Sequence, residues 1–267
     1  QVENSRHLKG LMSCGNNASC PVCASKLSAI HGNDLAELMS VGRKNNRGYI
    51  MLVNTIQHER GEKLELTMQQ VIDMSSDIFK QKEWKKFKEL TSLKFVIPAL
   101  EVMVSEKSGL IDWHPHKNFI LDFDIPIKKV MELVGVQTKD ALSMYISNLA
   151  VKLGRNYLFK KNIYKELFTP YFHTLTNKNG SERIVVKGGC SATCDFDDRY
   201  ITKWGLEAEM TASVYKVGKN RDSFHPYGLL DLIDDGNQDI DKKQKFKYSK
   251  AFQEFVLASK GRNWFKF

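Results

Sequence analysis

The pattern of apolar and polar positions divides the chain into strand-like and helix-like segments. Short apolar runs are typical of buried strands, and apolar residues at the 3.6-residue spacing indicate helices. The predicted strands cover residues 48–53, 93–105 and 113–123, with Pro98 indicating a sheet edge or a bulge. The predicted helices cover residues 67–90, 126–153 (as one helix or two) and 251–259, with one more from about 197 onward. A hairpin is expected over 171–175 and 183–187 around Asn179-Gly180, and a loop over 234–243.

This order of elements predicts an α+β fold. We expect a central antiparallel sheet with helices packed mainly on one face. Residues 1–47 are polar, rich in Asn, Ser and Gly, and contain three of the cysteines. We therefore expect an N-terminal cysteine-containing arm over 1–47 and one larger domain over 48–267.

Charge and composition limit the partners. Of the 267 residues, 40 are Lys or Arg and 31 are Asp or Glu, which gives a net charge of +9 and a pI near 9.2. A basic chain suits a polyanion such as nucleic acid. No apolar run reaches the ~18 residues of a membrane span, and none resembles a signal peptide. We expect a cytoplasmic protein with no membrane partner.

The first segment with recognisable chemistry is Trp113-His114-Pro115-His116-Lys117-Asn118. Side chains alternate across a strand, so His114, His116 and Asn118 share one face while Trp113 and Phe119 belong to the other. Two imidazoles two residues apart can converge on one divalent ion. Glu101 interrupts an otherwise apolar run and is the best candidate for a third ligand, because a buried carboxylate is costly unless it is paired or metal-bound. This donor set suits Mn²⁺ or Mg²⁺.

A second segment with recognisable chemistry is Asp197-Asp198-Arg199-Tyr200-Ile201-Thr202-Lys203. Tyr200 and Lys203 are three residues apart and share one face of the predicted helix. A phenol is a weak nucleophile unless its charge is stabilised, and a neighbouring Lys favours the phenolate. Tyr200 is therefore a candidate nucleophile, with Lys203 assisting it.

The cysteines form a third group. Cys14, Cys20 and Cys23 have a spacing that suits a structural Zn²⁺ with one more ligand. That ligand could be His7, His31, Cys190 or Cys194, and the spacing does not decide between them. The alternative is three free thiols.

These motifs together resemble the rolling-circle plasmid replication initiators of the HUH endonuclease superfamily. The resemblance rests on the Trp-His-Pro-His strand, the upstream Glu101 and the Tyr-x-x-Lys motif. It extends to Cys20-Pro21-Val22-Cys23-Ala24, Pro226-Tyr227-Gly228-Leu229-Leu230 and Lys260-Gly261-Arg262.

The resemblance implies an RRM-like catalytic sheet that nicks one strand of a plasmid double-strand origin. It implies a 5′-phosphotyrosyl intermediate at Tyr200, a free 3′-OH that primes replication, and His116 and Glu101 as metal ligands. The family often has a third histidine where this chain has Asn118, so the pair is either His114 with His116 or His116 with Asn118. Some relatives also have a Glu four residues before the tyrosine, where this chain has Phe196.

The expected partner is single-stranded or hairpin origin DNA. Candidate DNA-binding residues are Lys85, Lys86, Lys88, Trp204 and Arg262, with Trp113 and Trp264 as further stacking candidates. A host helicase is a candidate partner, because the chain has no Walker motif. Two alternatives stay open: a transposase or relaxase with the same chemistry, and a DNA-binding replication repressor without catalysis.

Overall fold

The computed structural model describes residues 20–163, 171–176, 182–187, 189–194, 223–234 and 240–262. The described chain is α+β, as predicted, and its strands pair antiparallel throughout. The described strands are β1 (Gly48–Asn54), β2 (Leu93–Lys107), β3 (Leu110–Phe123), β4 (Tyr171–Thr176), β5 (Glu182–Lys187), β6 (Cys190–Thr193) and β7 (Ser223–Phe224). The described helices are α1 (Pro21–Lys44), α2 (Leu64–Lys80), α3 (Lys82–Leu90), α4 (Ile127–Val134), α5 (Lys139–Lys160), α8 (Gly228–Ile233) and α9 (Lys242–Ser259).

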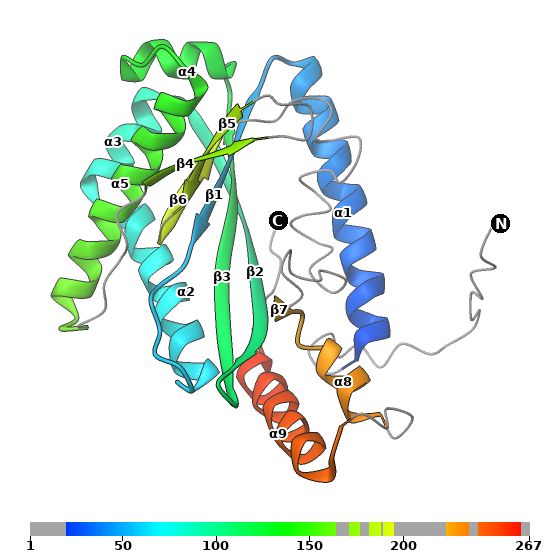
Figure 1. Ribbon diagram of the computed structural model, residues 1–267. Coiled ribbons are helices and arrows are strands. Elements are labelled where there is room, and N and C mark those ends of the chain that lie inside the picture. The colour runs from blue at the N-terminus through cyan, green and yellow to red at the C-terminus, as the bar shows by residue number, and fades with distance from the viewer. Residues whose placement is uncertain are drawn as a thin grey trace.

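Five of these strands form one sheet in the order β6-β1-β3-β2-β7 (Figure 1). The long hairpin of β2 and β3 is its centre, and β4 and β5 form the separate hairpin that the Asn179-Gly180 signal predicted. Pro98 lies inside β2 opposite Phe119. β2 lies second from the edge, and β7 pairs with it only at Val104 and Ser105.

One face of the sheet carries the main core. Odd-numbered residues of β3, among them Phe119, Leu121 and Phe123, pack with buried residues of α2, α3 and α5. Trp113, at the other end of the same face, packs with α9 and the start of α2. The two-residue period of the strand thus separates a core face from the face that carries the histidines.

The opposite face is covered by α1, for which the sequence indicated no helix (Figure 1). Leu35 and Met39 of α1 pack on Tyr49, Ala99 and Ile120. The apolar positions of α1 are sparse, so its stability depends on docking to the sheet rather than on an apolar stripe. Residues 21–44 of the predicted N-terminal segment thus form a helix that packs on the sheet.

Two predicted helix boundaries were wrong. The helix expected over 67–90 is interrupted at Gln81, whose extended backbone separates α2 from α3 and whose side chain donates to the Leu153 carbonyl at 2.8 Å. α9 begins at Lys242, not at Ala251, because Asp241 caps it by accepting from the backbone N–H of Gln244 at 2.8 Å.

Two serines of α5 attach the edge strand β6. The Ala192 N–H donates to Ser147 Oγ at 2.7 Å, and the Cys194 N–H donates to Ser143 Oγ at 3.0 Å. All four groups are buried. We expect Ser147→Ala to lower the free energy of unfolding by about 1–3 kcal/mol, because the Ala192 N–H would lose its partner away from water.

Urea denaturation measures this effect, with Ser76→Ala on α2 as a control. Ser76 is half-buried and also lies inside a helix. If Ser147→Ala were no more destabilising than this control, the serine would not anchor β6.

Candidate metal site on the central sheet

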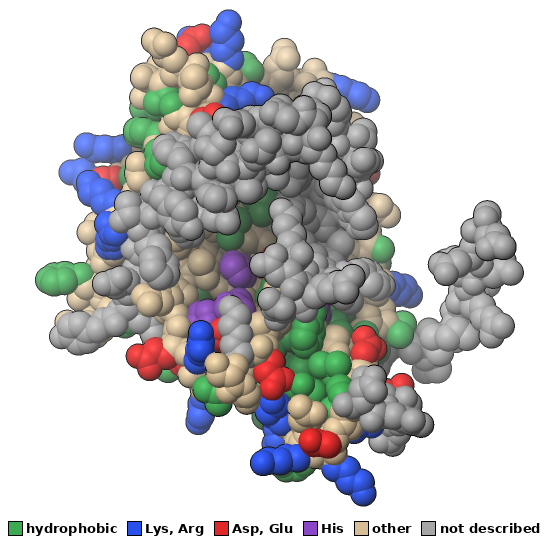
Figure 2. All heavy atoms as spheres, in the orientation of Figure 1, with side chains coloured by type: hydrophobic (Ala, Val, Ile, Leu, Met, Phe, Trp, Pro, Cys, Tyr) green, Lys and Arg blue, Asp and Glu red, His purple; other side chains and the backbone are tan. Residues whose placement is uncertain are grey.

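The polar face of β3 gathers the groups of chemical interest. Asp112, His114, His116 and Asn118 alternate with the core residues and therefore share one face. β2 adds side chains to the same face, because Ser105 pairs with Asp112 and Glu101 pairs with His116. Figure 2 shows histidine side chains gathered near the middle of this side of the molecule.

Three residues on this face form a group that could hold a metal ion. The ligand atoms of His58, Asp112 and His114 all lie within 4.8 Å of one another. His58 Nε2 is 3.1 Å from Asp112 Oδ1, and His114 Nε2 is 3.3 Å from Asp112 Oδ2. The two imidazoles meet edge to face, with ring centroids 4.7 Å apart. A buried carboxylate thus lies between two imidazole nitrogens.

The loop after β1 brings His58 to this group. Thr55 Oγ1 donates to the Pro115 carbonyl at 3.1 Å and holds the loop against β3. His58 Nδ1 lies 3.5 Å from the Ile56 carbonyl. With its proton on Nδ1, His58 would present the Nε2 lone pair to an ion bound beside Asp112, whereas without an ion the nearer Asp112 carboxylate can accept from Nε2–H.

A second polar group adjoins the first. The Asn118 amide donates to Glu101 Oε2 at 3.0 Å, and both side chains are buried. His225, which follows β7, is also buried. Burial lowers the pKa of His225 to about 4, and the nearby charge of Glu101 opposes this shift. His225 Nδ1 accepts the Tyr227 N–H at 3.2 Å, so the neutral ring is held as an acceptor.

Asn118 adds an observation of its own. Its Oδ1 is buried and has no hydrogen-bond partner. An orphaned carbonyl oxygen is costly in a protein interior and is a ligand type that divalent cations accept. The polar face of β3 thus continues beyond the three-residue group, with an oxygen atom that could be a ligand of a cation.

The residues predicted from sequence fall into two sets here. His114 belongs to the three-residue group, while Glu101 and His116 are paired beside it. Sequence reasoning missed Asp112 and His58. Asp112 stands two residues before His114, so the same alternation placed it on the histidine face, whereas the approach of His58 depends on a loop fold that no local pattern indicates.

Two predicted DNA contacts have structural roles. Arg262 Nε donates to the Ala258 carbonyl at 2.6 Å, and its Nη1 donates to Gln69 Oε1 at 2.8 Å, which ties the end of α9 to α2. Trp113 is buried in the core and donates to Glu254 at 3.3 Å, so it offers no stacking surface.

The lysines of α3 face solvent. Lys85 and Lys88 line a shallow pocket of about 630 Å³ together with Lys94, and Lys86 is exposed nearby. Tyr200, Lys203, Trp204, Trp264, Phe196 and Cys14 lie outside the described residues.

The described cysteines do not all lie close enough together to form the predicted zinc site. Cys20 and Cys23 are at the N-terminal end of α1, whose 24 residues span about 36 Å. Cys194 lines a pocket with Arg43 at the other end of that helix. Cys190 is fully buried in the main core, and burial raises the pKa of its thiol to about 12.

Neither Cys190 nor Cys194 can therefore complete a site with Cys20 and Cys23. His31 is also excluded, because it lies eight residues, or about 12 Å along the helix, beyond Cys23. Of the fourth ligands considered, only His7 stays open, and it lies outside the described residues, as does Cys14.

Within the described ranges, no helix combines the length and apolar content that crossing a membrane needs. Comparison of the chain with protein-family models, with curated proteins and with solved structures gave no match.

Proposed function

We propose that this chain is a metal-dependent endonuclease that nicks single-stranded DNA, as an initiator of rolling-circle plasmid replication does. The observation that carries the proposal is the polar face of β3, where His58, Asp112 and His114 converge. The net charge of +9 and the Tyr-x-x-Lys motif support it. The α+β sheet with a core on its other face holds these side chains rigidly.

The donor set fits a divalent cation. Two imidazole nitrogens and one carboxylate would hold Mn²⁺, Mg²⁺ or a related ion and leave positions for a phosphate oxygen and water. When bound, such an ion polarises a non-bridging phosphate oxygen and stabilises the charge of the transition state.

The protein's own groups supply the rest of the chemistry. Asp112 lies between both imidazoles and fixes their orientation. In the proposed reaction the Tyr200 oxygen, after losing its proton, forms a bond to phosphorus while the bond to the 3′-oxygen breaks. The products are a 5′-phosphotyrosyl link and a 3′-OH, which takes up a proton. Lys203, three residues further along the sequence, would favour the phenolate.

A different ligand set, His114 and His116 with Glu101, is the alternative from the sequence. Register supports it, since Glu101 faces His116 across the β2–β3 ladder. Both sets include His114. His58→Ala and Glu101→Gln therefore separate them, because each variant removes a ligand from one set only.

The test is formation of a covalent adduct with DNA. Incubated with Mn²⁺ and a labelled random-sequence library of single-stranded oligonucleotides, the protein is expected to form an SDS-resistant adduct. Tyr200→Phe should abolish the adduct, because phenylalanine has no oxygen to attack phosphorus. Tyr145→Phe on α5 is the matched control, since Tyr145 is partly exposed and lies in the helical layer on the core side of the sheet.

The adduct should also disappear in EDTA and return with Mn²⁺. Binding of the oligonucleotides without any adduct would overturn the nuclease proposal and leave a DNA-binding repressor. An adduct that persists in Tyr200→Phe would overturn the assignment of the nucleophile.

A further inference from the structure

The turn between α1 and β1 forms a basic pocket away from the histidines. The pocket has a volume of about 260 Å³, and its lining includes Arg43, Arg47, Tyr49 and Lys139. This is several times the roughly 30 Å³ that one water molecule occupies in the liquid. Within the described part of the chain, no carboxylate lines this pocket.

Several donors at this pocket lack partners. Arg43 Nη2, Arg47 Nη2 and Tyr49 Oη are buried and have no hydrogen-bond partner. Tyr49 as a whole is only 4% exposed. Buried guanidinium and hydroxyl groups are nearly always satisfied in native proteins, so three orphans at one place indicate a missing acceptor.

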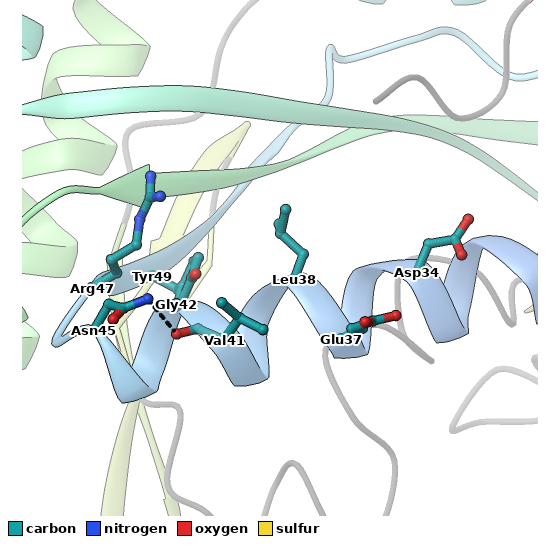
Figure 3. Close-up of a pocket in the computed structure, with 8 residues that line it drawn as sticks. All are labelled: Asp34, Glu37, Leu38, Val41, Gly42, Asn45, Arg47 and Tyr49. Atoms are coloured by element: carbon teal, nitrogen blue, oxygen red, sulfur yellow. Dashed lines mark hydrogen bonds between the residues drawn. The ribbon is translucent and has the colours of Figure 1, made fainter.

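The backbone is shaped to bring these groups together. A Cβ on Gly42 would lie 1.7 Å from Tyr49 Oη, so only glycine lets the tyrosine hydroxyl reach the helix. Figure 3 shows an adjoining pocket that shares Arg47 and Tyr49 with the basic pocket; in it Tyr49 lies beside Gly42 and Arg47 extends away from α1. Asp34 and Glu37 line that adjoining pocket, which makes it unsuitable for an anion.

Arg47 already has one carboxylate partner. Asp122 accepts from Arg47 Nε at 2.9 Å, which leaves the Nη2 side of the guanidinium for another acceptor. Arg47 Nε also lies 3.9 Å from Asp124, which pairs with Lys94 at 3.3 Å. Asp124 thus lies between Arg47 of the basic pocket and Lys94 of the lysine-lined pocket of α3.

We infer that the basic pocket between α1, β1 and α5 binds a phosphate group. A phosphate offers the several acceptor oxygens that two guanidinium groups and a hydroxyl require, and Arg matches it in planar geometry. The phosphate belongs either to the DNA backbone or to a free phosphate compound, and the chemistry of recognition is the same.

The position of the basic pocket suits a contact with the phosphate backbone of DNA. Asp122 and His114 lie on the same face of β3, eight residues or about 26 Å apart. A strand whose scissile phosphate is at the histidines would need several nucleotides to reach this pocket. If the bound phosphate belongs to DNA, the inference rests on the proposed function. The pocket itself does not depend on metal chemistry.

The experiment measures binding in EDTA, so that a failure of cleavage cannot be mistaken for a failure of this site. A fluorescent single-stranded oligonucleotide is titrated with wild type, Arg43→Gln, Tyr49→Phe and Lys139→Gln over a range of KCl concentrations. Lys44→Gln is the matched control, because Lys44 is exposed on the same helix and does not line the pocket. In a second arm, thermal stabilisation by inorganic phosphate is compared with that by chloride at equal ionic strength.

For a backbone phosphate, the Arg43 and Lys139 variants should bind the oligonucleotide about three- to tenfold more weakly than Lys44→Gln. Their salt dependence should be shallower by roughly one unit of slope. If only the stabilisation by inorganic phosphate is lost in these variants, the pocket takes a free phosphate compound. If the pocket variants match Lys44→Gln in both arms, the inference is overturned.

Discussion

Asp112→Ala is expected to weaken Mn²⁺ binding on the order of 100-fold or more. Loss of a residue that only supports a metal ligand already costs about 10- to 100-fold in affinity, and Asp112 would be a ligand itself. It is also the residue that both imidazoles contact, at 3.1 and 3.3 Å, so its loss removes a donor and the orientation of two others. Isothermal titration calorimetry with MnCl₂ measures the change.

Asp124→Ala is the matched control, because Asp124 lies just beyond β3 and is half-exposed. It should bind Mn²⁺ as wild type does. If Asp112→Ala kept its Mn²⁺ affinity while Glu101→Gln and His116→Ala lost theirs, the metal site would lie at Glu101 and not at Asp112. Unchanged affinity in all three variants would remove the metal site from this face.

Arg47→Met is expected to lower the free energy of unfolding by about 3 kcal/mol at neutral pH. Arg47 is the ion-pair partner of Asp122, whose side chain is 1% exposed. Removing one member of such a pair leaves a buried charge without compensation, which typically costs 3–5 kcal/mol. Urea denaturation at several pH values measures this cost.

The pH dependence has a definite sign. Burial raises the pKa of Asp122 above its usual value, and the Arg47 guanidinium opposes that shift. Without Arg47 the pKa rises further, so the folded state holds the proton more tightly than the unfolded chain does. The penalty of Arg47→Met is therefore complete above the folded pKa and shrinks as the pH falls towards about 4, where the unfolded carboxyl also titrates.

Two variants complete this experiment. Arg47→Met combined with Asp122→Asn should recover much of the loss, because no charge is then buried. Arg43→Met should have little effect, since Arg43 has no ion pair among the described residues and lies one helical turn earlier. A penalty that is independent of pH would mean that Arg47 acts through packing on Phe95, which lies 5.6 Å from its Cζ, and not through Asp122.

The strand signals in the sequence were local, and they predicted the three central strands β1, β2 and β3 but not the short edge strands β6 and β7. Alternation over 113–123 was sufficient to place His114, His116 and Asn118 on one face, because a strand fixes the side of every residue. The Asn-Gly signal likewise predicted the β4–β5 hairpin.

The sequence failed where tertiary contacts decide the structure. α1 is stabilised by the sheet it covers, and its sparse apolar positions give no periodic signal. His58 reaches Asp112 across 54 residues of chain, so the three-residue group could not be predicted from spacing. The assignment of Tyr200 stays a prediction, since it lies outside the described residues.

The register of the β2–β3 hairpin also limits how this protein can change in length. Removing one residue between Asp112 and Asn118 would put the two parts of the strand out of phase, so that either the residues before the deletion or those after it would exchange the core face for the ligand face. Insertions inside the ladder are excluded for the same reason. The turn at Ser108 and Gly109, which have φ values of 54° and 77°, lies beyond both faces. Related chains should therefore vary in length at this tip and keep a constant count between it and the histidines.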